Sequence, residues 1–385
     1  MSKIGKFLEK KKGTILSLIG SLLMLLLAGG IGAYVAIYQT YCAQKYMDDY
    51  YNCFLNESYM ALYSSSGVED SDFINATTFN NMMINEYGYE ETDSYSVSKM
   101  SKSGKNARAT VTFTDSATDE EVSWELRMEK GDKSHYLFFK EWKVNIDDFI
   151  IENVKIVTDK EVEVVIDDKN ITTENLKSVR KTVDEETGLC TYIIDKMFLG
   201  AHTILFIGQN TEVESVLASF DKEHKYYDFK EGVFKKQYQQ ELSSAVTKII
   251  VETYNSAFNG SGIENLSALF AKKEGMTERV MTVYTNMINS INKEDGSTLS
   301  SIDITDYSIT FDKYDFDGNV RARFYYTANF TAKGGRTIDY GVRENYEGTA
   351  TSEAYITFEL IDGTWQATDI EIECIDYSKP EEVTE

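Results

Sequence analysis

The chain has 385 residues, enough for two or three domains of ordinary size. It carries 63 acidic against 39 basic side chains, a net charge of −24, and this excess of acid repels nucleic acid, so DNA- and RNA-binding proteins are excluded as a class. Hydrophobic residues make up 42% and aromatic residues 13% of the chain, which indicates packed cores rather than a disordered acidic polymer. With three His and four Cys, the chain has almost no ligands for an iron–sulfur cluster or a zinc ribbon, so no metal or cofactor is expected.

An uncharged stretch of 26 residues, residues 13–38, comes first in chain order. As a helix it is about 39 Å long, which exceeds the roughly 30 Å of a bilayer's hydrocarbon core. We therefore expect residues 13–38 to form a transmembrane helix. A cleaved signal peptide stays open as an alternative, because Ala28-Gly29-Gly30 offers a peptidase small residues, although the apolar run is longer than such peptides usually have.

The charges around this stretch predict its orientation. Residues 1–12 contain five Lys and one Glu, whereas Lys45 is the sole base in roughly the next sixty residues. By the positive-inside rule, residues 1–12 form a basic cytoplasmic tail, and the bulk of this single-pass cell-membrane protein is extracellular. Tyr34, Tyr38 and Tyr41 suit the aromatic belt at the outer face of the membrane.

Residues 39–148 are expected to form a membrane-proximal α+β domain. A tyrosine-rich helix is predicted over 42–63, followed by a shorter helix that carries Phe79, Met82, Met83 and Tyr87. Apolar and polar residues then alternate over 107–114 and 122–129, and a last strand over 138–144 contains Trp142.

Residues 149–235 show no long helical stripe. Short apolar runs at 154–157, 162–166, 191–194 and 202–207 are broken by turn sequences such as Asp167-Asp168-Lys169-Asn170. Short strands at this spacing predict a small β-sandwich module.

Residues 236–377 are expected to form a distal α+β domain, followed by an acidic tail at 378–385. An apolar stripe over 242–250 predicts one helix, and Thr277 can cap a second whose apolar face ends at Ile291. Beyond Asp295-Gly296 the period changes to two, with strands predicted over 320–330, 356–360 and 365–374 and a tight hairpin at Asp362-Gly363. Both end domains thus place helices before a meander of long strands. The predicted fold class is α+β, with two cone-like domains of helices on a curved antiparallel sheet separated by a small β-sandwich.

This order of modules resembles a known family. The segments ending in Glu141-Trp142-Lys143-Val144 and Asp362-Gly363-Thr364-Trp365 look like nuclear transport factor two / ketosteroid isomerase-like domains, and the middle segment, around 164–169 and 198–204, resembles small β-modules of bacterial stalks. One anchor followed by such modules is similar to the TcaA-like membrane proteins of Gram-positive bacteria. The resemblance implies a place in the cell envelope and an association with the response to glycopeptide antibiotics. The zinc ribbon that commonly opens these proteins is missing, because residues 1–12 contain no Cys.

A calcium loop at residues 312–319 fails on spacing. With Gly318 at loop position six, Lys313 occupies position one and Phe324 position twelve, where acidic ligands are required. A hairpin turn at Asp317-Gly318 is predicted instead.

No nucleophile–base pair and no spaced set of metal ligands is visible, so no catalytic, cofactor-binding or metal-binding residue is nominated. His135, His202 and His224 lie far apart in the sequence, and structural roles are expected for them. Trp124, Trp142 and Trp365 are expected in the cores rather than as stacking platforms for sugar rings.

The four Cys are expected to be free thiols. Cys42 and Cys53 are eleven residues apart on one predicted helix, about 16 Å by helical rise, which is too far for a disulfide. Cys190 and Cys374, the latter on the apolar face of a strand, are expected to be buried. Cys42 lies just above the predicted span, so a homodimer joined through the membrane-proximal region stays open.

The sequence therefore predicts a non-catalytic, membrane-anchored protein that binds or senses a cell-wall component or an envelope protein. Two alternatives remain: an enzyme that uses the cavity of a cone domain, and a purely structural assembly protein.

Overall fold

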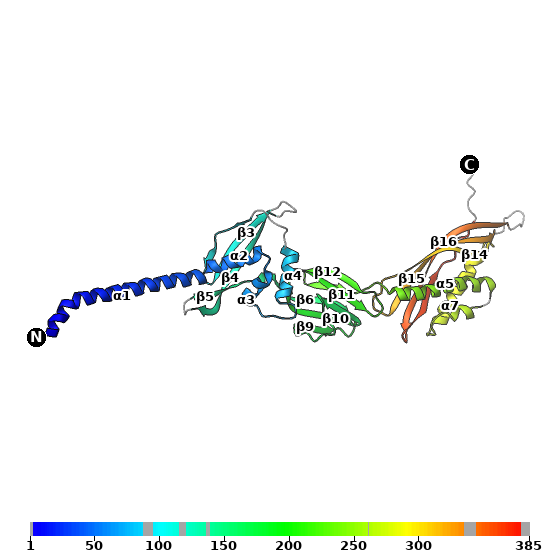
Figure 1. Ribbon diagram of the computed structural model, residues 1–385. Helices are drawn as coiled ribbons and strands as arrows, with labels where there is room; N and C mark the ends of the chain where they lie inside the picture. Colours follow the sequence, from blue (N-terminus) through cyan, green and yellow to red (C-terminus); the bar gives the residue numbers. More distant parts are fainter. Residues whose placement is uncertain are drawn as a thin grey trace, which may run out of the picture.

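The computed structural model describes residues 3–87, 95–114, 121–135, 139–260, 262–334 and 344–378. The molecule is elongated: a long N-terminal helix at one end is followed by three folded parts in a row (Figure 1). Some residues used in the sequence analysis lie outside this described part: Phe138 and nearly all of the predicted acidic tail. Of some others only the backbone is described: residues 3–12, Tyr87, Val122 and Trp124.

Helix α1 (Lys3–Tyr41) has 39 residues. Within the described residues it is the one helix long and apolar enough to cross a membrane. Its aliphatic side chains have no protein around them, with Leu22 60% and Leu25 70% exposed. Such a surface is costly to expose to water.

The proximal domain combines three helices with an antiparallel sheet. The helices are α2 (Ala43–Leu55), α3 (Tyr59–Ser66) and α4 (Ala76–Tyr87). Helices α2 and α3 pack on the sheet, and α4 packs on α3. The sheet has the order β1-β3-β4-β5, with β2 paired to β3, and its strands are β1 (Tyr95–Val97), β2 (Ser101–Ser103), β3 (Asn106–Thr114), β4 (Glu121–His135) and β5 (Phe139–Val144). Leu62, Phe79 and Met83 of the helices are fully buried in one core with Val111 and Leu126 of the sheet.

The single helix expected over 42–63 is wrong. The chain breaks between α2 and α3, where Glu57 has a φ of 51° and the Ser58 N–H bonds the Cys53 carbonyl at 2.7 Å. Asn56 ends α2 by donating its side-chain amide to the Asn52 carbonyl at 2.7 Å. Asn and Ser compete with the helical backbone in this way, which explains the break. The turn lets α3 bury its own apolar side against the sheet.

Two four-stranded sheets form the middle of the molecule. One has the order β13-β6-β10-β9 and the other β12-β11-β7-β8. A short 3-10 helix, η1 (Asp147–Phe149), leads into them, and the strands are β6 (Ile150–Asp159), β7 (Val162–Ile166), β8 (Lys169–Asn170), β9 (Val179–Val183), β10 (Leu189–Phe198), β11 (Gly200–Gly208), β12 (Glu214–Phe220) and β13 (Tyr226–Phe229). All neighbouring strands are antiparallel except β13 and β6, which run parallel.

The distal domain places three helices on a sheet with the order β14-β15-β16-β17. The elements are α5 (Lys236–Asn259), α6 (Glu264–Ser267), α7 (Met276–Ile291), β14 (Thr298–Phe311), β15 (Asn319–Lys333), β16 (Asn345–Ile361) and β17 (Thr364–Ile372). β15 alternates between buried and more exposed side chains along its whole length, as its sequence predicts. The hairpin at Asp362-Gly363 is confirmed, with φ of 49° and 76° at its two central residues.

Two details of the distal domain correct the sequence analysis. Helix α7 begins at Met276 with Gly275 as its N-cap, at a φ of 80°, and Thr277 lies exposed inside the first turn. Met276 is buried, so the helix starts early enough to bring it into the core, and the glycine makes the required left-handed turn. Cys374 lies beyond the end of β17 rather than on a strand, and it is only partly buried.

Aromatic side chains fill the inside of the distal cone. Tyr254 and Tyr326 share a hydrogen bond of 2.7 Å between their hydroxyls, and the Ile375 N–H donates to Tyr254 Oη at 3.2 Å. Both tyrosines are buried, which raises their pKa. No Asp or Glu among the described residues is buried.

The three folded parts contact one another at their junctions. Phe198, at the end of β10, lies in the proximal core, whereas Phe73, which precedes α4, lies in the core of the sandwich. At the second junction, Gly232 and Tyr314 exchange two backbone hydrogen bonds of 2.8 Å. The α+β class with several antiparallel sheets is confirmed, while the domain boundaries at 148/149 and 235/236 stay predictions.

Candidate functional site

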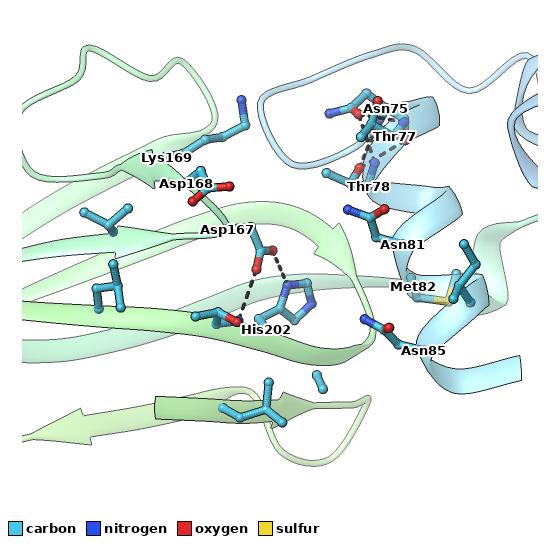
Figure 2. A pocket seen from close by; sticks show the side chains of 16 residues that line it. Asn75, Thr77, Thr78, Asn81, Met82, Asn85, Asp167, Asp168, Lys169 and His202 are labelled. Carbon is cyan, nitrogen blue, oxygen red and sulfur yellow. Dashed lines mark hydrogen bonds and ion pairs between the residues drawn. The ribbon is translucent and has the colours of Figure 1, made fainter. Parts of the chain in front are cut away.

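A pocket of about 680 Å³ lies at the first junction, between α4 and the sheet that contains β7, β11 and β12 (Figure 2). We call it the junction pocket. Its lining comes from three stretches of chain and one further residue: Asn75, Thr77, Thr78, Asn81, Met82, Ile84, Asn85; Val165, Asp167, Asp168, Lys169; Ala201, His202, Thr203, Leu205; and Leu217.

One wall of the junction pocket is the exposed face of α4. Asn75 caps the helix, because its Oδ1 accepts hydrogen bonds of 3.1 Å from the backbone N–H groups of Thr77 and Thr78. Asn75 N–H donates in return to Thr78 Oγ1 at 3.1 Å, which fixes the first turn. Asn81 and Asn85 follow four residues apart on the same face of the helix, as Figure 2 shows.

The opposite wall is the turn between β7 and β8. Asp167 and Asp168 have φ of 46° and 67°, values that Asp tolerates better than most residues and that a two-residue hairpin requires. Asp167 accepts the Thr203 N–H at 3.1 Å and lies 2.6 Å from His202 Nδ1.

His202 is a supporting residue of this wall. It is 8% exposed, and its Nε2 lies 2.9 Å from the Phe198 carbonyl oxygen, so both ring nitrogens already have partners. Its hydrogen bonds position Asp167 and leave neither ring nitrogen free to act on a ligand.

Four polar groups remain available to a ligand. The side chains of Asn81, Asn85 and Asp168 make no hydrogen bond or ion pair with other described residues. The Lys169 side chain makes none either, although its charge acts on Asp72 at a distance. Two amides, a carboxylate and an ammonium group can together donate to carbonyls, accept from N–H groups and bind both ends of a zwitterion.

The remaining lining is aliphatic. Leu217 is 72% and Ile84 47% exposed, and Leu205 and Val165 are half-buried beside them. Among the described residues, no Phe, Tyr or Trp lines the junction pocket. The site therefore suits an extended, hydrogen-bonding chain with short apolar branches better than a sugar ring, which is usually bound by stacking.

The three histidines lie in different elements. His135, at the end of β4, stacks on Tyr41 with ring centroids 4.5 Å apart. His224, in the turn between β12 and β13, lies 2.9 Å from Asp221, and this contact raises the pKa of the imidazole. Among the described residues, no group of three or more His, Cys, Asp or Glu is placed to hold a metal ion.

The tryptophans with described side chains belong to the cores. Trp142 is 4% exposed, with the ammonium groups of Lys102 and Lys130 5.2 Å and 5.6 Å from its ring. Trp365 packs edge-on against Phe234, with centroids 5.1 Å apart.

All four Cys are free thiols. Cys190 is fully buried, and burial raises the pKa of Cys374 to about 11. Cys42 is the N-cap of α2 and is partly exposed.

Residues 312–318 connect β14 to β15. Gly318 has a φ of 87°, and Asp317 accepts the Asn319 N–H at 2.7 Å, so the chain does turn at these residues. The turn belongs to a connection of seven residues, however, and not to the tight hairpin that the sequence predicted.

Sequence reasoning missed the junction pocket, because its walls lie about 80 to 140 residues apart in the chain. Two local signals were available. Asn75 and Thr78 have the spacing of a capping box, and Asp167-Asp168 marks a tight turn. Neither signal says that the two features face each other.

The chain is similar in structure to an NTF2-like protein with a cystatin-like fold from Novosphingobium aromaticivorans, at 16% sequence identity and a TM-score of 0.22, over 37% of this chain and 88% of that chain. It is also similar to Aln2 from a Streptomyces species, at 16% identity and a TM-score of 0.21, over 34% of this chain and 90% of that chain. A third similar structure is an NTF2-like protein involved in plasmid conjugation, at 8% identity and a TM-score of 0.19, over 75% of this chain and 79% of that chain. No protein-family model and no curated protein matches the chain.

Proposed function

We propose that this protein is a non-catalytic binding protein, held in the cell membrane by α1 and binding its ligand in the junction pocket. The observation that carries the proposal is the α4 wall, where two amides one turn apart face an open carboxylate and an open ammonium group. Polar groups without protein partners that converge on a pocket are typical of ligand sites.

The anchor is proposed from the surface of α1. Its aliphatic side chains are exposed over a length that exceeds the hydrocarbon thickness of a bilayer. The five Lys before residue 13 support a cytoplasmic N-terminus and extracellular domains. The order of modules, which resembles that of TcaA-like proteins, supports a place in a bacterial cell envelope.

The ligand class follows from the lining. The lining combines two amides, an adjacent carboxylate and ammonium group, and aliphatic side chains. Such a lining suits an extended peptide, such as the peptide portion of a cell-wall polymer. The aromatic filling of the distal cone and the absence of a buried carboxylate among the described residues favour binding over catalysis.

The test uses the full chain in lipid nanodiscs. Binding of short wall peptides, wall glycans and a cationic peptide is measured by calorimetry at low and high salt. We expect the wall peptide to bind and the glycan not to bind. The double substitution Asn81→Ala with Asn85→Ala should weaken binding by about tenfold or more, because each lost hydrogen bond contributes about 1 kcal/mol.

Asn52→Ala is the matched control, since Asn52 is also an exposed helical amide but lies on α2, outside the lining. It should leave the affinity unchanged. Turnover of a small substrate with no peptide binding would contradict the proposal and favour an enzyme. Salt-sensitive binding of the cationic peptide alone would instead indicate a general attraction to the acidic surface.

A further inference from the structure

Five aromatic rings meet where α1 joins the proximal domain. Tyr34 and Tyr38 of α1 lie 5.6 Å and 6.5 Å from Phe139, and Tyr41 stacks on His135 at 4.5 Å, measured between ring centroids. We call these five residues the aromatic collar. Phe139 begins β5 and His135 ends β4, and the two residues pair with each other, so the collar joins α1 to these ends of the β4–β5 hairpin.

The depth of the collar follows from helical rise. A hydrocarbon core of roughly 30 Å takes about 20 helical residues. Counted from Leu16, an exposed aliphatic residue near the start of the uncharged stretch, those residues end near Val35. Tyr34 therefore lies at the outer edge of the hydrocarbon, and Phe139, which packs against it, lies at the same depth.

The side chains of this region suit that depth. Tyr34 and Tyr38 remain 58% and 53% exposed, and aromatic rings are favoured at the boundary between headgroups and hydrocarbon. Lys133, on the same hairpin, is exposed and forms no ion pair with the described residues, so its ammonium group can reach lipid phosphates.

We propose that the paired ends of β4 and β5, at His135 and Phe139, are a second membrane contact, docked in the outer interface of the bilayer beside α1. This inference rests on the proposed anchoring by α1. Figure 1 shows α1 meeting the proximal domain beside β5. The proximal domain would then stand on the membrane in one fixed orientation.

The test places a tryptophan reporter in the full chain reconstituted in vesicles that contain brominated lipid, which quenches tryptophan only on close contact. The variants are Phe139→Trp, Tyr34→Trp and, as a matched control, Tyr325→Trp on the exposed face of the distal sheet. The fluorescence of the unsubstituted chain is subtracted. We expect quenching of the reporters at 139 and 34 to a similar extent and none at 325.

Quenching at 34 without quenching at 139 would contradict the proposed docking of the hairpin while leaving the anchoring by α1 intact. The same result is expected if a second copy of the chain, and not lipid, covers the hairpin. No quenching at 34 would overturn the anchor and the docking together. If circular dichroism shows that Phe139→Trp does not fold, His135→Trp reports on the same hairpin with the same criteria. Lys133→Glu should reduce quenching at 139 and leave quenching at 34 unchanged.

Discussion

Asp72 connects the proximal domain to the sandwich. Its Oδ2 accepts the Ser178 hydroxyl at 2.6 Å and the Ser178 N–H at 3.1 Å, and these hydrogen bonds lower its pKa. The substitution Asp72→Ala should reduce the free energy of unfolding by about 1–2 kcal/mol, because Ser178 is buried and loses its partner. Denaturant titration measures this, with the exposed Glu69→Ala as a control that should change little. An unchanged midpoint in Asp72→Ala would contradict a structural role for this contact.

Acid should weaken the same junction. Asp148 also has a lowered pKa, chiefly because Lys222 donates to it at 3.0 Å, and it pairs with Arg127 of β4 as well. A carboxyl with a lowered pKa stabilises the fold above its ordinary pKa of about 4, and this contribution is lost as pH falls through the lower folded value. Stability should thus decrease below about pH 4. In the double variant Asp72→Asn with Asp148→Asn, the decrease measured by denaturant titration should be smaller.

Neither contact could be predicted from the sequence. Asp72 and Ser178 are 106 residues apart, and no local pattern marks one polar residue as the partner of another. The residues of the junction pocket share this limit.

At the scale of elements, the segment that follows β17 closes the distal cone. Tyr377 is fully buried, and its hydroxyl donates to the carbonyl oxygens of Ser290 and Ile291 at 2.9 Å each. Tyr377→Ala should reduce the free energy of unfolding of the distal domain by about 3–5 kcal/mol, the usual result for a buried aromatic residue. Tyr377→Phe, which keeps the ring, should lose only about 1 kcal/mol. Tyr307→Ala, at a tyrosine that is 52% exposed, is the control in the same thermal unfolding experiment.

Elements whose apolar residues recur at a regular spacing could be predicted from the sequence, and elements defined by long-range contacts could not. β15 alternates over 15 residues, and its sequence alone indicates a half-buried strand. β9 carries mostly exposed side chains and exists because β10 pairs with it, so its sequence has no such signal. The break between α2 and α3 depends on Asn56 and Ser58, which have low helix propensity. The helical spacing of the tyrosines is the stronger pattern in the sequence and therefore predicts one continuous helix.

At the scale of the whole molecule, the orientation in the membrane stays a prediction that one experiment can test. Protease added to intact protoplasts that express the chain should remove everything beyond about residue 40, because the five Lys hold the N-terminus inside. Immunoblotting against tags at the two ends reads the outcome. Protection of the C-terminal tag would contradict the orientation, and loss of the N-terminal tag without lysis would do so as well.

The parallel pairing of β6 and β13 has a mechanical consequence. These are the first and last strands of the sandwich, and Tyr226 to Phe229 pair in register with Lys155 to Thr158. A pull between the membrane and the distal domain would draw the start of β6 and the end of β13 in opposite directions, so their hydrogen bonds would be loaded in shear, all together, instead of opening one by one. In single-molecule stretching from both ends of the chain, the sandwich should therefore resist the greatest force. Tyr227→Pro, which removes one backbone donor from the pair, should lower that force and shorten the lifetime under load.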